Sequence, residues 1–410
     1  MSWLTAALPG VGGSYKETPA DFEVEEIPLY PCSGVGEHLY LWVEKTGIST
    51  MELMSRIARG TGLKEDAIGY AGLKDSRALT RQWLSIPVAK RQQLDGLQLD
   101  NARILAVEQH GNKLRQGHLA GNRFRICLHT TTAAAAERAA AILDILGQRG
   151  VPNLFGEQRY GILGNSGRLG ELLLSGSYTA FCEELIGDPE LIQHPGWQRA
   201  AQAYRRNELA QAVACLPGGM RIEQRLLGDL IKGKSHRAAA LGLPRQRLRL
   251  YLSAAQSAFF DRLLLDRITA PEQLKHGDIA YKHANGACFR VTAADTEQPR
   301  ADSFEISPTA PLFGYKVMIA AGEPGRAETA LLKSAGLDLN SWKLERGLAM
   351  PGERRPLRVP LGQARVSPAP DGRLILEFSL PKGSYATSVL REVMKSSAEG
   401  SAELLLCRQK

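Results

Sequence analysis

Hydrophobic residues recur with two different spacings along this chain. Four segments have the short apolar–polar period of β-strands, namely residues 20–40, 82–88, 122–129 and 374–380. Four others have apolar stripes or residue content typical of helices, namely residues 49–60, 133–146, 253–268 and 387–394. The sequence therefore predicts a chain that contains both strands and helices from one end to the other.

Helix boundaries are marked most clearly in the first helical segment. Ser49 and Glu52 have the spacing of a capping box, and Gly60 and Gly62 supply the stop. In the last helical segment, Thr387 is predicted to act as the N-cap.

Length and composition indicate an ordinary globular protein. The chain has 410 residues, 44% of them hydrophobic and 23% charged, which favours two or three domains. It contains no run of 18 apolar residues, and no basic residue precedes Lys16, so neither a membrane span nor a secretory signal is predicted. We expect a cytoplasmic protein, with domain boundaries at the Gly- and Pro-rich stretches 164–170 and 351–360.

Cysteine and histidine spacing argues against a metal site. No CxxC, HxH or HxxxH pattern occurs, so we predict reduced thiols and no bound metal. The six cysteines lie far apart in the sequence, at Cys32, Cys127, Cys182, Cys215, Cys288 and Cys407.

Positive charge is concentrated in one stretch. The whole chain has a formal net charge of +8. Between residues 220 and 252, only Glu223 and Asp229 oppose eight basic residues, which are Arg221, Arg225, Lys232, Lys234, Arg237, Arg245, Arg247 and Arg249. Such a cluster could neutralise the phosphates of a polyanionic partner, or it could be a solvated helix face.

Asp75 is the leading candidate for a catalytic side chain. It follows the glycine-punctuated turn that begins at Gly69, and it is flanked by Lys74 and Arg77. Glycines let a ligand approach the backbone closely, and neighbouring cations favour an ionised carboxylate, which a nucleophile or base needs. The alternative is that Asp75 is a capping or solvated turn residue.

Two further segments have the composition of a nucleobase or phosphate site, and a third segment carries no such signal by itself. Residues 151–161 combine Asn153 with Phe155, Arg159 and Tyr160, and such an amide and aromatic rings suit a base edge and a base face. Residues 381–392 lead from a glycine turn into a helix N-terminus, and residues 19–26 form an acidic segment with one aromatic. Each could instead be an ordinary packed or capped segment.

Together, these four segments resemble the motifs of the TruD family of pseudouridine synthases. The matching strings are P-x-D-F-x-V-x-E at 19–26, A-G-x-K-D-x-x-A-x-T-x-Q at 71–82, V-P-N-x-F-G-x-Q-R-[FY]-G at 151–161 and G-S-[FY]-A-T-S-V-x-R-E at 383–392. Their order and length make the resemblance specific, and it covers nearly the whole chain.

The resemblance implies a role for each matched position. Asp75 would be the essential aspartate, Phe22, Asn153 and Tyr385 would line the uridine pocket, and Phe155 would stack near the target base. Position 385 departs from the phenylalanine of well-known members, and the added hydroxyl needs a hydrogen-bond partner. Supporting roles are expected for Lys74, Gln82, Arg159 and Arg391.

The resemblance also implies a fold and a domain plan. The expected fold is α+β, a mixed and mostly antiparallel sheet flanked by helices, with an inserted α+β domain specific to the family. Residues 1–164 and 351–410 would form the catalytic domain, and residues 165–350 would form the insert, which contains the basic stretch.

The implied activity is conversion of uridine to pseudouridine in tRNA, typically at position 13, without a cofactor or an obligatory protein partner. The ionised Asp75 could attack C1′ of the ribose or remove a sugar proton, and the sequence leaves both routes open. Two rivals remain. A non-catalytic RNA-binding protein would not need Asp75, and a glycosidase usually needs two carboxylates.

Overall fold

The computed structural model describes residues 2–129 and 134–395. The chain forms two compact units, which we call the sheet unit (residues 3–151 and 359–395) and the inserted unit (residues 152–358). The boundaries between these units lie before residue 164 and after residue 351, the limits expected for the inserted domain. The extents of the expected domains stay a prediction. Cys407 lies outside the described residues.

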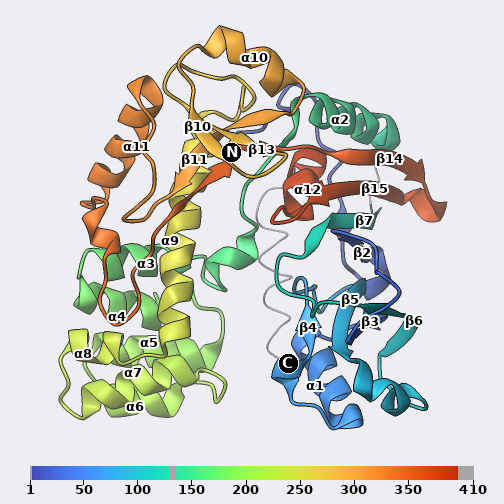
Figure 1. Ribbon diagram of the computed structural model, residues 1–410. Coiled ribbons are helices and arrows are strands. Elements are labelled where there is room, and N and C mark those ends of the chain that lie inside the picture. Colours follow the sequence, from blue (N-terminus) through green and yellow to red (C-terminus); the bar gives the residue numbers. More distant parts are fainter. Residues whose placement is uncertain (1, 130–133, 396–410) are drawn as a thin grey trace. The chain divides into compact units, whose positions relative to one another are not determined.

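The sheet unit is built on one mixed sheet of nine strands (Figure 1). Its main path runs β14-β15-β7-β2-β5-β3-β6, with β1 paired to β7 and β4 to β5. Among the strand pairs of this sheet within residues 2–129 and 134–395, only β2–β5 is parallel, which confirms the mixed, mostly antiparallel sheet. The strands are β1 (Ser14–Tyr15), β2 (Phe22–Pro28), β3 (His38–Thr46), β4 (Gly69–Tyr70), β5 (Leu79–Pro87), β6 (Ala102–His110), β7 (Leu119–His129), β14 (Gly362–Pro368) and β15 (Leu374–Pro381).

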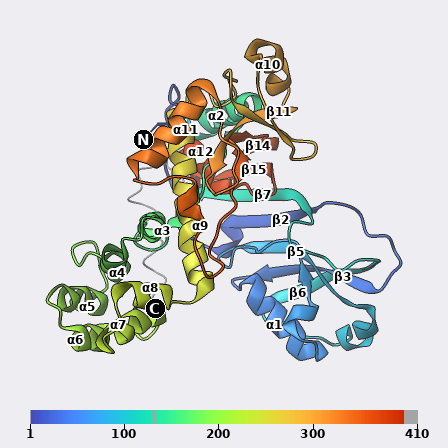
Figure 2. The ribbon, with the colours of Figure 1, turned by 60° about the vertical axis from the view of Figure 1, so that its left-hand side comes forward.

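Helices cover this sheet at its two ends (Figures 1 and 2). They are α1 (Thr50–Thr61), α2 (Ala135–Arg149) and α12 (Ala386–Met394), with short 3-10 turns η1 (Pro19–Asp21), η2 (Glu65–Ala67), η3 (Val88–Leu94) and η6 (Pro370–Gly372). On β15 every second side chain is buried, so Leu376 and Phe378 pack in one core with Ile142 of α2. A second core joins Leu41 of β3 to Ile57 of α1. Each such burial stabilises the fold by about 1.5–3 kcal/mol.

The helix ends confirm some of the predicted signals and correct others. The Ser49 side chain accepts the Glu52 backbone N–H at 3.1 Å, and Gly62 ends α1 with a left-handed φ of 66°. The Glu52 carboxylate pairs with Arg56 rather than closing a capping box. The predicted cap at Thr387 is wrong, because α12 begins one residue earlier, at Ala386.

The inserted unit is mainly helical, with one four-stranded sheet. Its helices are α3 (Ser166–Leu174), α4 (Tyr178–Ile186), α5 (Pro195–Arg205), α6 (Leu209–Cys215), α7 (Arg221–Ile231), α8 (His236–Leu241), α9 (Arg245–Asp266), α10 (Ala294–Asp302) and α11 (Gly322–Ser334), with turns η4 (Glu157–Tyr160) and η5 (Asn340–Trp342). Its sheet comprises β9 (Ile279–Lys282), β10 (Cys288–Arg290), β11 (Ile306–Leu312) and β12 (Glu353–Pro356). The chain passes between the units at β8 (Val151–Pro152) and β13 (Arg358–Val359).

Helix α9 is the spine of the inserted unit, and Figure 2 shows its length beside the shorter helices. It buries Phe259 and Phe260 in the largest core. Helix α3 crosses it at Gly170, where a Cβ atom would lie 2.2 Å from the Tyr251 carbonyl oxygen, so only glycine allows this approach. Helix α9 begins at Arg245, eight residues before the predicted start at Ser253.

In residues 2–129 and 134–395, no helix combines the length and the apolar character that crossing a membrane requires.

Candidate active site

Asp75 lies in the loop between β4 and β5 of the sheet unit, and its side chain is 24% exposed. One carboxylate oxygen pairs with the ammonium of Lys16, and the other accepts the backbone N–H of Arg77 at 3.0 Å. Charge-assisted bonds of this kind fix both the position and the direction of an ionised carboxylate. The group is therefore held in place while part of its surface remains open to a ligand.

Lys16, which pairs with Asp75, has an unusual backbone conformation. It follows β1 directly and has a left-handed φ of 65°, which is rare for a residue with a Cβ atom. Its ammonium lies 4.0 Å from the centre of the Phe22 ring and so also makes a cation–π contact. Backbone strain of this type costs about 1–3 kcal/mol and is typical of functional sites.

Buried polar side chains hold the Asp75 loop from the interior. Gln82 is fully buried; its amide donates to the Gly72 carbonyl oxygen at 3.3 Å and accepts the Thr50 hydroxyl at 2.9 Å. The same Thr50 oxygen accepts the backbone N–H of Lys74 at 2.9 Å. Gln82 thus supports the loop backbone rather than contacting the Asp75 carboxylate.

Lys74 points away from Asp75, although the two are adjacent in sequence. Its ammonium lies 2.9 Å from a Glu26 carboxylate oxygen and 2.8 Å from the Asn122 side-chain oxygen. Burial raises the pKa of Glu26 despite the opposing effect of Lys74. The prediction that Lys74 is a cation beside the Asp75 carboxylate is corrected, because Lys16 occupies that position.

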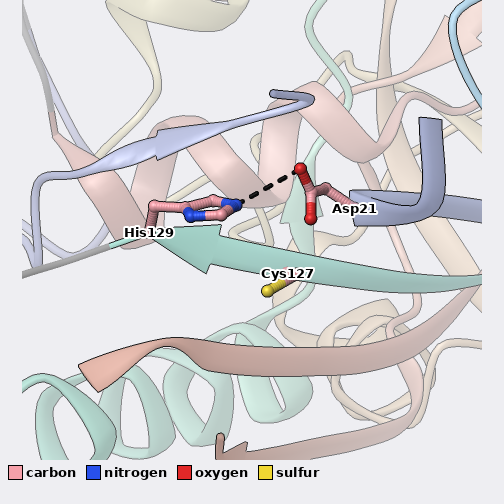
Figure 3. Close-up of side chains that lie close together, drawn as sticks. All are labelled: Asp21, Cys127 and His129. Carbon is pink, nitrogen blue, oxygen red and sulfur yellow. Dashed lines mark ion pairs between the residues drawn. The ribbon is translucent and has the colours of Figure 1, made fainter. Parts of the chain in front are cut away.

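Phe22 starts β2 and is held by the turn before it. Its ring is 5% exposed and packs edge-to-face on Phe124, with ring centres 6.2 Å apart. In the preceding turn the Asp21 carboxylate accepts the Thr18 backbone N–H at 2.7 Å and pairs with His129 at 3.2 Å (Figure 3). These bonds attach the turn to β7 and thereby fix Phe22.

Asp21, Cys127 and His129 also form the one group of three potential metal-binding side chains within residues 2–129 and 134–395, as Figure 3 shows. Burial raises the pKa of Asp21, but the Thr18 amide and His129 outweigh it, so the net shift is downward. Burial raises the pKa of the Cys127 thiol. An ionised carboxylate paired with the imidazole, beside a protonated thiol, accounts for the cluster as a structural contact, and the absence of a metal stays a prediction.

Removal of metal ions from the purified protein is expected to leave the rate of the activity implied by the family resemblance unchanged, since isomerisation of uridine to pseudouridine needs no Lewis acid or redox centre. The protein is dialysed against EDTA, its metal content is measured by mass spectrometry, and the tRNA is folded with spermidine. A loss of rate that Zn²⁺ restores and Mg²⁺ does not would contradict this and would assign a metal to Asp21, Cys127 and His129.

In the inserted unit, Asn153 and Phe155 are organised by Arg355. The Asn153 amide donates to the Pro356 carbonyl oxygen at 2.9 Å, and its oxygen accepts the Arg355 guanidinium. That guanidinium lies 4.3 Å from the centre of the Phe155 ring, and Phe260 packs edge-on to the same ring at 5.8 Å. Asn153 therefore positions an arginine that covers one aromatic ring.

Arg159 attaches its loop to helix α9. The guanidinium donates to the Ser257 hydroxyl at 3.1 Å and also to the Ser253 hydroxyl. It lies 5.6 Å from the centre of the Phe155 ring. Its place in the motif is thus explained by loop support, and its supporting role toward substrate stays a prediction.

Tyr385 and Arg391 belong to the sheet unit, at helix α12. Tyr385 is the N-cap residue, and 38% of its surface is exposed. The Arg391 guanidinium lies 4.3 Å from the centre of the Trp3 ring and 3.5 Å from a Glu392 carboxylate oxygen. Arg391 therefore contacts the N-terminal segment, while Tyr385 presents an aromatic side chain to solvent.

Residues 1–393 match the family model described as tRNA pseudouridine synthase D (TruD). The chain belongs to the TruD family. Proteins named tRNA pseudouridine synthase D from Syntrophotalea carbinolica and Geobacter metallireducens are 52% and 51% identical, over 96% of this chain and 99% and 97% of theirs. A crystal structure from Methanosarcina mazei, described as a candidate TruD, superposes with a TM-score of 0.82 at 26% identity, covering 97% of this chain and 96% of that one.

The comparisons confirm the TruD family and the α+β fold that the four motifs indicated. The structure adds three residues that the sequence analysis missed. Lys16 and Lys45 contact Asp75 from distant parts of the chain, so no local pattern marks them. Arg355 could have been found from the sequence, because it lies in the short string G-E-R-R-P-L at residues 352–357, between two motifs of the TruD family.

Proposed function

We propose that this chain converts the uridine at position 13 of tRNA to pseudouridine, with Asp75 as the catalytic carboxylate. The observation that carries the proposal is the partly exposed Asp75 side chain, oriented by the Lys16 ammonium and the Arg77 amide on a loop fixed from the interior. Membership of a family of tRNA pseudouridine synthases supports it. A cytoplasmic location, where tRNA is found, is part of the same proposal.

The reaction is an isomerisation in which no atom is gained or lost overall. The bond between uracil N1 and ribose C1′ breaks, the base turns, and C5 bonds to C1′ while the C5 proton leaves and N1 acquires a proton. The Asp75 carboxylate either attacks C1′ or removes a sugar proton, and both routes need it ionised and directed at the ribose. The Lys16 and Arg77 contacts support both, because they favour the charged form of the carboxylate and fix its direction.

Aromatic residues are proposed to hold the base after it leaves its stack. Taking a base out of a helix costs a few kcal/mol, which stacking and phosphate contacts must offset. Phe155 is the proposed stacking platform, since Arg355 and Phe260 already fix its ring. Phe22 and Tyr385 are also proposed to contact the uridine, and Asn153 is proposed to act at the base through its amide.

The direct test is tritium release from tRNA labelled at C5 of the uridine at position 13, with purified full-length protein. Release together with pseudouridine at position 13 of the product supports the proposal. A transcript with cytidine at position 13 serves as the matched control. Turnover of free uridine in place of tRNA would favour a glycosidase, and tight RNA binding without tritium release would favour a non-catalytic RNA-binding protein.

The basic stretch of the inserted unit is proposed to contact tRNA phosphates. Its eight Lys and Arg side chains are all exposed, on α7, on the segment between α7 and α8, on α8 and on the first turns of α9. Arg245 and Arg249 donate to the Gly347 carbonyl oxygen, at 3.0 Å and 2.8 Å, and so also have a structural role. The residues of α7 and its C-terminal end are better suited to a test.

Replacing Arg221, Arg225 and Lys232 together with alanine is expected to weaken tRNA binding and to flatten its salt dependence. The logarithm of the association constant falls as log salt rises, and each lost phosphate contact reduces the magnitude of that slope by about 0.7–0.9. Binding is measured by fluorescence anisotropy at several KCl concentrations.

The matched control removes the same charge from helix α5 and its C-cap by replacing exposed Arg199, Arg205 and Arg206 with alanine. If both triple variants change the slope equally, net charge rather than this surface determines binding.

A further inference from the structure

Lys45 is a fully buried lysine that contacts the backbone of Asp75. It lies near the end of β3, with none of its surface exposed. Its ammonium donates to the Ile48 carbonyl oxygen at 2.6 Å and to the Asp75 carbonyl oxygen at 2.9 Å. Asp75 is therefore held twice, at its carboxylate by Lys16 and at its main chain by Lys45.

Burying an ammonium group destabilises the folded state more than burying an apolar side chain of similar size. Removing an ion from water costs several kcal/mol, and replacing buried charges by apolar side chains is often neutral or stabilising. Burial lowers the pKa of Lys45 from 10.5 to about 8, with the Asp75 carboxylate opposing and the Lys74 ammonium reinforcing the shift. Stability alone therefore does not account for a lysine at this position.

We propose that Lys45 is a positioning residue of the pseudouridine-forming reaction, which fixes the Asp75 backbone and so the direction of its carboxylate. The inference rests on the proposed role of Asp75. Misplacement of a reacting group by 1 Å costs about 10²-fold in rate, so a backbone contact is enough to matter.

The remainder of the loop shows the same principle. Gln82 holds the Gly72 carbonyl oxygen and Thr50 holds the Lys74 amide, both from the interior. Lys45 completes the series at Asp75 itself, and of these side chains it alone carries a charge. Its contact is therefore the one that pH can alter.

Because of Lys45, we expect the free energy of unfolding to rise and the reaction rate to fall above pH 8. Its folded-state pKa is depressed, so between about pH 8 and 10.5 the unfolded state binds more protons, and the Lys45 contribution to the free energy of unfolding rises with pH. In the same range the folded protein loses the ammonium and keeps only a weaker, neutral donor. The reaction rate is expected to fall as stability gains.

The test compares Lys45→Met with Lys395→Met in the full-length protein. Lys395 is a partly buried lysine whose pKa is also lowered by burial, and it donates to the carbonyl oxygens of Thr5 and Leu8 instead of the Asp75 loop. Single-turnover rates and tRNA dissociation constants are measured from pH 6.5 to 9.5. Lys45→Met is expected to lose about 30- to 100-fold in rate at pH 7, with unchanged tRNA affinity and no fall in rate through pH 8. Lys395→Met is expected to keep the wild-type rate and pH profile.

The outcomes separate this inference from the proposed function. A Lys45→Met rate within about threefold of wild type overturns the inference, while the role of Asp75 stands if Asp75→Asn is inactive. If Asp75→Asn is active, both fall. Should Lys45→Met not fold, the wild-type protein still decides, because a rate that stays flat from pH 7.5 to 9 also overturns the inference.

Discussion

Replacing Asp75 with asparagine is expected to abolish pseudouridine formation while leaving tRNA binding intact. Asparagine has nearly the same shape but no charge, so it can neither attack C1′ nor accept a sugar proton. Loss of a residue that acts directly on the reacting atoms costs about 10⁴-fold or more. The single-turnover rate is measured by tritium release from C5, and the tRNA dissociation constant is measured by anisotropy.

Asp66→Asn is the matched control for this experiment. Asp66 is an exposed aspartate in η2, a few residues before the Asp75 loop, and it differs from Asp75 in lacking the ion pair to Lys16. It should retain the wild-type rate. Product formation by Asp75→Asn at more than about a hundredth of the wild-type rate would exclude Asp75 as the catalytic carboxylate.

Replacing Lys16 with methionine is expected to produce the second largest loss, about 10²-fold in rate, the size found when one electrostatic contact at a reacting group is removed. The ammonium orients the Asp75 carboxylate and balances its charge. Methionine retains the Cβ atom and most of the length of the side chain, so the left-handed backbone strain at this residue is unchanged. Single-turnover rates at saturating protein isolate the chemical step from tRNA binding.

Lys113→Met is the control for Lys16→Met, because Lys113 donates to the Asp66 backbone carbonyl oxygen and not to Asp75. Lys16→Arg is expected to recover part of the rate, since a guanidinium can also pair with the carboxylate. Equal losses in Lys16→Met and Lys113→Met would show that general loss of positive charge, and not the pair with Asp75, lowers the rate.

The family, and the segment that carries the proposed catalytic aspartate, were accessible from sequence because the motifs are local. A glycine turn, a carboxylate and a following strand occupy one short segment, and the chain folds that segment as β4, a loop and β5. The helix signals at Ser49 and Gly62 succeeded for the same reason, since capping depends on residues within one turn.

The environment of Asp75 was only partly predictable. Sequence adjacency suggested Lys74 as the cation beside Asp75. The loop instead turns the Lys74 side chain inward, so this residue is only 8% exposed, whereas the neighbouring Leu73 is 63% exposed. Likewise, Asn153 was expected to face a base, whereas its amide binds Pro356 and Arg355 from the other end of the inserted unit. Its role at the uridine stays a prediction.

By itself, the sequence determined the family, the mixed fold and the place of Asp75 along the chain, because these depend on short motifs whose residues are close together in the sequence. Only the tertiary structure decided what holds that carboxylate. Lys16 and Lys45 are 59 and 30 residues away from Asp75 along the chain. They meet it because β1, β3 and β5 take fixed places and registers in one sheet, with Lys45 opposite Thr80 of β5. Pairing between strands is a non-local property of the whole core, which no local pattern records.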